Sequence, residues 1–171
     1  MILLIAGSSH TGKTLAAQRV LERYAFPYLS IDHLKMGLIR SGICPLTPES
    51  PDEELTPYLW NIVREIIKTA VENGQNLVVE GCYLPFDWKK DFEKAYLEQI
   101  RFLCLIFSES YIQNHYGDIV RHADAIERRG ADSHCTKELL LRENRDNLEK
   151  CRQHGCDFLL IDRPYRVEIE L

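Results

Sequence analysis

Near its start the chain carries the pattern Gly-x-x-x-x-Gly-Lys-Thr, which is the motif of a phosphate-binding loop. Its members are Gly7, Ser8, Ser9, His10, Thr11, Gly12, Lys13 and Thr14. The two glycines permit a tight turn, so that loop N–H groups and the N-terminus of a following helix can surround an anion. We expect Lys13 to reach the β- and γ-phosphates of a nucleoside triphosphate, and the Thr14 hydroxyl to ligate Mg²⁺.

This motif becomes specific through its context, since it needs a strand before it and a helix after it. Residues 1–6 are an apolar run that predicts the strand, and the helix is expected to begin near Lys13. A glycine turn that binds nothing is the alternative, and both flanking elements argue against it. The sequence therefore predicts binding of a nucleoside triphosphate, with ATP and Mg²⁺ as the leading hypothesis.

Strand and helix patterns alternate along the whole chain. Apolar runs typical of strands buried on both faces of a parallel sheet occupy residues 1–6, 27–31, 76–80, 100–107 and 157–161. Residues 55–71 place their apolar side chains along one stripe of a helix. Residues 43–53 hold three prolines and three acids and are predicted to form a surface loop. The alternation predicts an α/β three-layer fold in which residues 1–171 form one domain.

Acids follow two of the predicted strands, at the edge where ligands of an open parallel sheet bind. Asp32 could deprotonate or orient an acceptor hydroxyl, hold a water on Mg²⁺, or cap the next helix. Glu80 has the position of a carboxylate that orients the Mg²⁺ water shell beside Thr14. Alternatively, Glu80 could bind substrate hydroxyl groups, or it could end a strand without a chemical role. Tyr83, just beyond Glu80, is a further candidate for contact with the acceptor.

Other polar residues near these positions are assigned no chemistry. The His10 side chain can point away from the phosphates, so only its backbone N–H is expected to contribute. His33 and Lys35 are predicted to face solvent. Asp162 closes the last apolar run but stands near the chain end, and it is interpreted as a turn residue.

The polar segment 108–135, between the last two strands, is predicted to be a mobile lid, with two plain surface helices as the alternative. Guanidinium groups suit the charge that spreads over a transferring phosphoryl group. The arginines of the lid and of the helix after it are Arg121, Arg128, Arg129, Arg142 and Arg145. We expect two or three of them to contact nucleotide phosphates, with Arg128 and Arg142 as the catalytic candidates. Arg40, on the helix after Asp32, is a candidate for holding an anionic group of the acceptor.

Charge and cysteine usage argue against several classes of protein. The net charge is −5 and no basic stripe is visible, so a nucleic-acid partner is not expected. The six cysteines contain no C-x-x-C pair, which disfavours zinc. Cys82 and Cys104 lie in or beside apolar runs and are predicted to be reduced core thiols of a cytoplasmic protein. The first apolar run is too short for a membrane span and lacks the basic flank of a signal peptide.

Taken in order, these features resemble the P-loop small-molecule kinases, which include adenylate kinase-like nucleotide kinases, shikimate kinase and the zeta-toxin-like kinases. The resemblance implies a five-stranded parallel sheet in the order 2-3-1-4-5, helices on both faces, a helical lid, ATP on the first loop, and an acceptor over the helices after the second strand. It also implies that Asp32 is the acid near the acceptor and that Arg128 or Arg129 is a lid arginine. Adenylate kinases carry an Asp-Gly-Phe-Pro-Arg segment after the third strand, where this chain has residues 80–85, Glu-Gly-Cys-Tyr-Leu-Pro. The arginine expected to grip a nucleotide phosphate is therefore missing from that segment.

The leading functional prediction is an ATP- and Mg²⁺-dependent phosphotransferase. Its acceptor would be a small hydroxylated or phosphorylated metabolite or nucleotide. The alternative is a nucleotide-binding regulatory switch with slow NTPase activity, which would act through a protein partner at the 43–53 loop. A guanine-specificity motif of the Asn-Lys-x-Asp type would favour the switch, and the sequence contains none.

Overall fold

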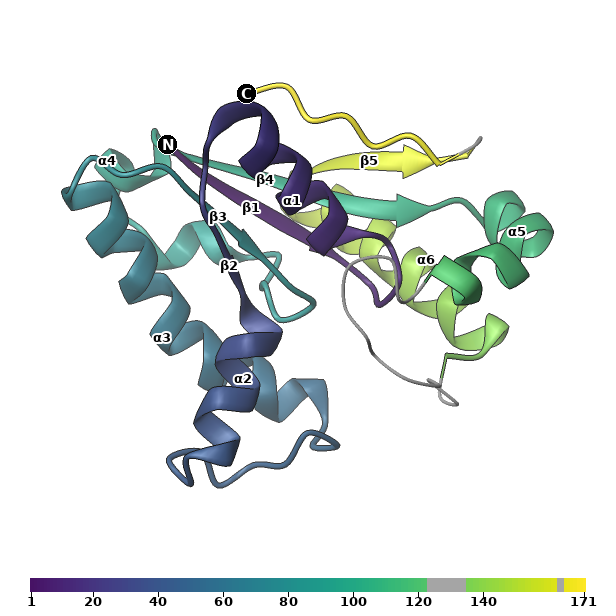
Figure 1. The fold of residues 1–171 in the computed structure, drawn as a ribbon, viewed down its shortest axis with the longest axis horizontal. Coiled ribbons are helices and arrows are strands. Elements are labelled where there is room, and N and C mark those ends of the chain that lie inside the picture. Colours follow the sequence, from purple (N-terminus) through teal and green to yellow (C-terminus); the bar gives the residue numbers. More distant parts are fainter. Residues whose placement is uncertain (123–134, 163–164) are drawn as a thin grey trace.

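A computed structural model describes residues 1–122, 135–162 and 165–171 (Figure 1). Five parallel strands form one sheet in the order β2-β3-β1-β4-β5. The strands are β1 (Ile2–Gly7), β2 (Tyr28–Ser30), β3 (Leu77–Glu80), β4 (Ile100–Phe107) and β5 (Asp157–Ile161). The central strand β1 is buried along its whole length because β3 and β4 pair with its two sides and helices cover its two faces. The predicted fold class and strand order are confirmed.

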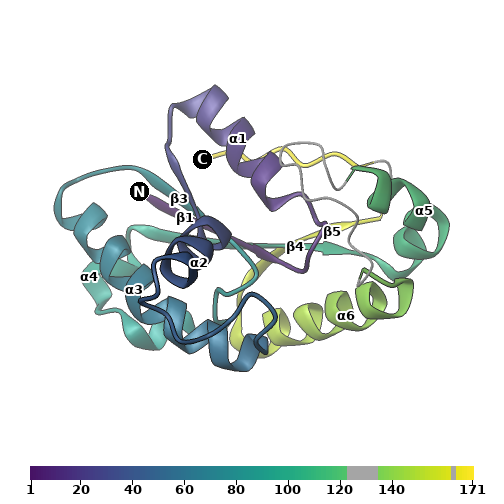
Figure 2. The same ribbon diagram turned by 60° about the horizontal axis from the view of Figure 1, so that its bottom comes forward.

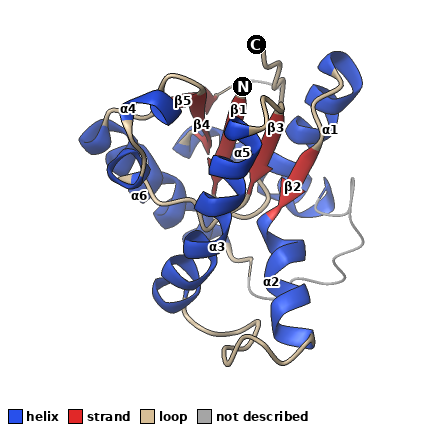
Figure 3. Cartoon of the chain, turned by 90° about the vertical axis from the view of Figure 1, so that its left-hand side faces the viewer, coloured by secondary structure: helices blue, strands red, loops and turns tan. Residues whose placement is uncertain are grey.

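Helices cover both faces of this sheet. They are α1 (Lys13–Tyr24), α2 (Ile31–Arg40), α3 (Asp52–Glu72), α4 (Lys94–Leu97), α5 (Glu109–Arg121), α6 (Lys137–His154) and the 3₁₀ helix η1 (Trp88–Asp91). Figures 2 and 3 show α1 on one side of the sheet and α4 and α6 on the other. Two apolar clusters fill the space between the layers, one mainly beneath α3 and the other beneath α1 and α5. The result is the three-layer arrangement that the alternating pattern predicted.

The predicted helix over residues 55–71 is confirmed as part of α3. Its buried side chains Leu55, Leu59, Val63 and Ile67 recur every four residues and form one stripe against the sheet. Burying each contributes about 1.5–3 kcal/mol. Three acids, Asp52–Glu54, occupy the first turn, where the helix dipole favours negative charge. The helix therefore begins inside the segment predicted to be a loop, and the loop ends at residue 51.

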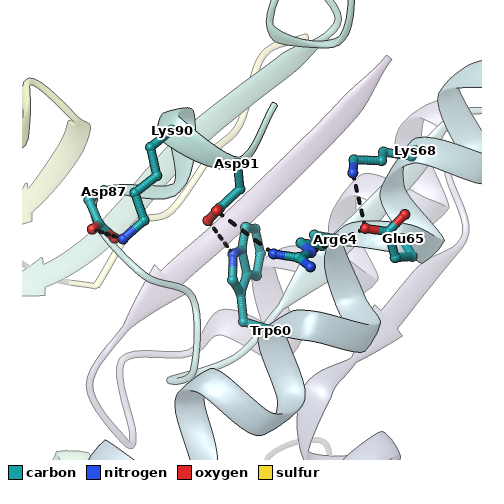
Figure 4. Close-up of polar contacts among 7 residues, drawn as sticks. All are labelled: Trp60, Arg64, Glu65, Lys68, Asp87, Lys90 and Asp91. Atoms are coloured by element: carbon teal, nitrogen blue, oxygen red, sulfur yellow. Dashed lines mark hydrogen bonds and ion pairs between the residues drawn. The ribbon is translucent and has the colours of Figure 1, made fainter. Parts of the chain in front are cut away.

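A polar contact fixes α3 to the connection that follows β3 (Figure 4). The indole N–H of the buried Trp60 donates to the Asp91 carboxylate at 2.8 Å, and the Arg64 guanidinium lies 3.8 Å from the other Asp91 oxygen. Asp87 and Lys90 form an ion pair within the same connection. This connection leads from Glu80 into η1. The contacts therefore help to fix the position of the chain that follows β3, next to the edge of the sheet where the predicted acids lie.

The segment 108–135 begins with α5, which directly follows β4. The Ser108 hydroxyl accepts from the Tyr111 backbone N–H as an N-cap, and Tyr111 stacks on Phe107 with ring centroids 5.0 Å apart. Asp162, interpreted as a turn residue, accepts from the Ser108 and Ser110 hydroxyls at 2.6 and 2.7 Å. Residues 123–134 lie outside the described part of the chain, so closure of a lid over the site stays a prediction.

No helix among the described residues is long and apolar enough to cross a membrane. All six cysteines lie among the described residues, and none of them forms a disulfide there. Cys104 is buried in the core as expected, but Cys82 is exposed, so the prediction that Cys82 is a core thiol was wrong. Cys82 lies two residues beyond the end of β3, and its neighbours Gly81, Tyr83 and Leu84 are buried.

Candidate functional site

The loop between β1 and α1 has the backbone geometry that its glycines predict. Gly7 and Gly12 have φ angles of 144° and 80°, and His10 at φ 66° also adopts the left-handed region. A Cβ atom on Gly12 would lie 2.0 Å from the Tyr165 hydroxyl. That hydroxyl donates to the Thr11 carbonyl at 3.1 Å, and burial raises the pKa of Tyr165 to about 12, which keeps the donor protonated. The side chain of Tyr165, in the C-terminal segment, therefore packs against the backbone of the loop and stabilises it.

Lys13 begins α1 and is buried, with 5% of its surface exposed. Its ammonium group donates to the Ser8 carbonyl at 2.8 Å, inside the curl of the loop. Burial alone would lower the pKa of Lys13, but interactions with Cys82, Glu80 and Asp32 together raise it above its ordinary value. The residue is therefore a permanent positive charge at the centre of the loop.

Thr14 and Glu80 meet at the carboxyl edge of the sheet. Glu80 ends β3 and stands in register between Ile5 of β1 and Ser30 of β2, with 1% of its surface exposed. The Thr14 hydroxyl donates to the Glu80 carboxylate at 3.2 Å. Burial raises the pKa of Glu80 against the opposing effects of Lys13, Ser30 and Thr14. A buried hydroxyl and carboxylate in contact fit Mg²⁺, which takes oxygen ligands and is usually held by one or two protein side chains plus phosphates and waters.

Asp32 and Tyr83 lie on the α2 side of this edge and are joined by Lys35. The Lys35 ammonium donates to the Tyr83 hydroxyl at 2.8 Å and lies 3.4 Å from the Asp32 carboxylate. Only 12% of the Lys35 side chain is exposed, so the prediction that it faces solvent was wrong. Lys35 stands one turn after Asp32 on α2, and this spacing places both on the face that meets Tyr83. An i, i+3 pair of opposite charge was the signal that could have found it.

Asn144 is a second residue that the motifs did not indicate. It is 2% exposed in the middle of α6, where its side-chain amide donates to the Ser8 hydroxyl at 2.9 Å and to the Leu140 carbonyl at 2.8 Å. Its carbonyl oxygen accepts from the Phe107 backbone N–H at 2.8 Å. One side chain thus ties the phosphate loop to the end of β4 and to α6. An asparagine within a polar helix carries no sequence signal for such a role.

Replacing Asn144 by Ala should lower the free energy of unfolding by about 1–3 kcal/mol, because the Phe107 N–H and the Ser8 hydroxyl would be left buried without their partner. Urea denaturation measures this loss. The matched control is Asn114→Ala, which removes an exposed amide that donates to the Ser110 carbonyl one turn away and should change stability by less than about 0.5 kcal/mol. Equal losses in the two variants would contradict a special role for Asn144.

The structure does not bring all the candidate arginines to this site. Arg40 ends α2, eight residues beyond Asp32, which is about 12 Å along the helix axis. Arg121 pairs with Asp118 at 3.1 Å, and Arg145 lies 3.8 Å from Glu109. Arg142 is exposed on α6. Arg128 and Arg129 lie outside the described residues.

No protein-family model and no curated protein matches this sequence, whereas solved structures match its fold. The chain is similar to a sugar kinase from Janibacter sp. HTCC2649, with a TM-score of 0.53 and 16% identity over 95% of this chain and 86% of that chain. It is similar to shikimate kinase from Bacteroides thetaiotaomicron (TM-score 0.53, 12% identity, 95% and 85% of the two chains). It is also similar to deoxyadenosine kinase from M. mycoides (TM-score 0.52, 13% identity, 95% and 90%). The chain therefore has the fold of the P-loop small-molecule kinases.

Proposed function

We propose that this protein is an ATP- and Mg²⁺-dependent kinase that transfers the γ-phosphate to a hydroxyl group of a small acceptor. The observation that carries the proposal is the meeting of four groups at one sheet edge: the buried Lys13 within the loop, the Thr14–Glu80 contact, and Asp32 beside them. The similarity of the fold to small-molecule kinases supports the same class of reaction.

Each residue has a distinct task in such a transfer. The loop N–H groups and Lys13 hold the phosphates, and Lys13 exchanges its bond to the Ser8 carbonyl for bonds to phosphate oxygens. Thr14 and Glu80 would hold Mg²⁺, which supplies positive charge to the phosphate oxygens. Asp32 accepts the proton of the acceptor hydroxyl while that oxygen bonds to the γ-phosphorus. The bond from phosphorus to the bridging oxygen breaks, and ADP leaves.

The test is ADP release from Mg·ATP in the presence of pooled acceptors: sugars, amino sugars, nucleosides, nucleoside monophosphates, sugar phosphates and small hydroxy acids. The proposal expects release that depends on one pool and on Lys13. Slow release that no pool changes would argue instead for the regulatory switch, and a search for a protein partner would follow.

Replacing Glu80 by Gln should raise the Mg²⁺ concentration needed for half-maximal turnover about 10- to 100-fold, the range found when groups that support a metal are lost. Because burial raises the pKa of Glu80, the wild-type protein should lose Mg²⁺ affinity as the pH falls through a value above that of an ordinary glutamate. The variant should lack this pH dependence. Mg²⁺ titrations at several pH values measure both effects, with Glu65→Gln on the exposed face of α3 as the control. If Glu65→Gln changed the required Mg²⁺ concentration and its pH dependence as much as Glu80→Gln, the assignment of Glu80 as a residue that holds Mg²⁺ would be contradicted.

A further inference from the structure

Residues 165–171 form neither a helix nor a strand, but their side chains alternate between the core and the solvent. The inward side chains pack against the apolar cluster beneath α1 and α5, and they are those of Tyr165, Val167, Ile169 and Leu171. The Arg19 guanidinium of α1 donates to the Val167 carbonyl at 2.9 Å. The segment is therefore anchored beside α1 (Figure 1), and Tyr165 at its start has a defined position next to the phosphate loop.

The Tyr165 hydroxyl meets the backbone of the loop. The Tyr165 ring packs edge-on against Phe107, with the ring centroids 6.3 Å apart. Its hydroxyl donates to the Thr11 carbonyl at 3.1 Å and lies 3.5 Å from the Gly12 carbonyl. There is room for it because Gly12 has no side chain, since a Cβ atom there would lie only 2.0 Å from the hydroxyl. The Thr11 carbonyl is therefore directed toward Tyr165.

The direction of the Thr11 carbonyl also determines the direction of the next N–H group. The peptide between Thr11 and Gly12 is trans, and a planar trans peptide points its C=O and its N–H to opposite sides. The Gly12 N–H thus points away from Tyr165. It donates to no acceptor within the part of the chain that the structure describes, although Thr11 and Lys13 on either side of it are buried. An N–H group at the start of a helix is a donor that suits an anion.

We propose that Tyr165 is a positioning residue for the nucleotide: it holds the Thr11 carbonyl and so aims the Gly12 N–H at a phosphate group before the nucleotide binds. This inference rests on the proposed function, because it requires a nucleotide in the loop. Without the hydroxyl, the peptide before Gly12 is free to rotate, since glycine adopts many backbone conformations. The nucleotide would then have to fix that peptide as it binds, and this ordering lowers the affinity.

Tyr165→Phe tests the proposal, because it removes the hydroxyl and keeps the ring that packs on Phe107. The Kd for Mg·ATP and the Kd for inorganic pyrophosphate should both rise about 3- to 10-fold, the range that the loss of one neutral hydrogen bond allows. The kcat at saturating ATP should change much less, since the bound nucleotide has already fixed the peptide. Titration calorimetry well below the melting temperature measures both Kd values. The matched control is Tyr96→Phe, which removes a hydroxyl that donates to Glu72 at 2.7 Å, on a helix that precedes the start of β4, and should leave both values unchanged.

A second measurement follows the Gly12 N–H directly. In ¹H–¹⁵N NMR spectra of the wild-type protein, its signal should move downfield when Mg·ADP binds, because the N–H then donates to a charged oxygen. An unmoved signal would overturn the proposal. So would equal Kd values for the wild type and Tyr165→Phe, or equal losses in Tyr165→Phe and Tyr96→Phe.

Two further outcomes separate this proposal from its neighbours. If Tyr165→Phe weakened the binding of ATP but not of pyrophosphate, Tyr165 would contact the nucleoside and would not orient the loop. The positioning role would then be refuted and the kinase would stand. If the wild-type protein bound neither Mg·ATP nor pyrophosphate, both the positioning role and the proposed function would be lost.

Discussion

Replacement of Lys13 by Ala is expected to lower kcat/KM for phosphoryl transfer from Mg·ATP by about 10²–10³-fold or more, the loss typical of one preorganised donor. The ammonium group is already desolvated and held 2.8 Å from the Ser8 carbonyl, so it needs little rearrangement to meet a phosphate. Its raised pKa keeps it charged across the whole range in which the protein can be assayed. Steady-state ADP release with a saturating acceptor measures the effect.

Two further variants make this result interpretable. Lys13→Met keeps most of the buried volume, so a similar loss of activity in Met and Ala variants points to the missing charge and not to a collapsed loop. Lys68→Ala removes a lysine that pairs with Glu65 on α3, away from the loop, and should leave turnover unchanged. Thermal melting of each variant without nucleotide checks that it folds. Full activity in a folded Lys13→Ala protein would refute the proposed function.

The fold was predictable because it depends on short-range patterns. Each strand coincides with a mainly apolar run, and the observed β4 (Ile100–Phe107) and β5 (Asp157–Ile161) have the predicted bounds. Burial on both faces was expected for all five strands, and it is found for β1, β3 and most of β4. It was wrong for β5, which lies at the edge of the sheet and exposes three of its five residues. The strand order came from resemblance to the P-loop kinases, since periodicity alone does not specify which strands are neighbours.

Site residues could be predicted from the sequence only where a single short segment of the chain determines how they are arranged. The phosphate loop lies within eight consecutive residues, and Glu80 could be recognised because it ends an apolar run. For Lys35 the sequence offered only the i, i+3 pairing with Asp32, because its other partner, Tyr83, lies 48 positions away. Asn144 was missed because it reaches the loop from 136 positions away. Whether a polar side chain on a surface helix faces solvent or a neighbour depends on packing between elements, which local sequence does not encode.

Asp32→Asn is expected to lower kcat about 10²–10⁴-fold, the range for loss of a general base, with little change in the KM for ATP. Asn matches the size of Asp and can still orient a hydroxyl through its carbonyl oxygen, but it cannot take up the proton. The 3.4 Å contact with Lys35 restrains the orientation of the carboxylate, which receives the proton of the acceptor hydroxyl in the proposed reaction. Single-turnover transfer to the best acceptor measures the effect.

The same substitution separates catalysis from a purely structural role of Asp32 in the first turn of α2. Ser30 is the N-cap of α2, so Asp32 does not cap this helix, and loss of its negative charge near the helix dipole should cost only about 0.3–1 kcal/mol of unfolding free energy. Glu138→Gln removes a comparable acid from the first turn of α6 and should show that small stability loss with normal kcat. If Asp32→Asn behaved like Glu138→Gln in both measurements, Asp32 would be a helix-stabilising residue, and the proton would have to leave the acceptor by another route.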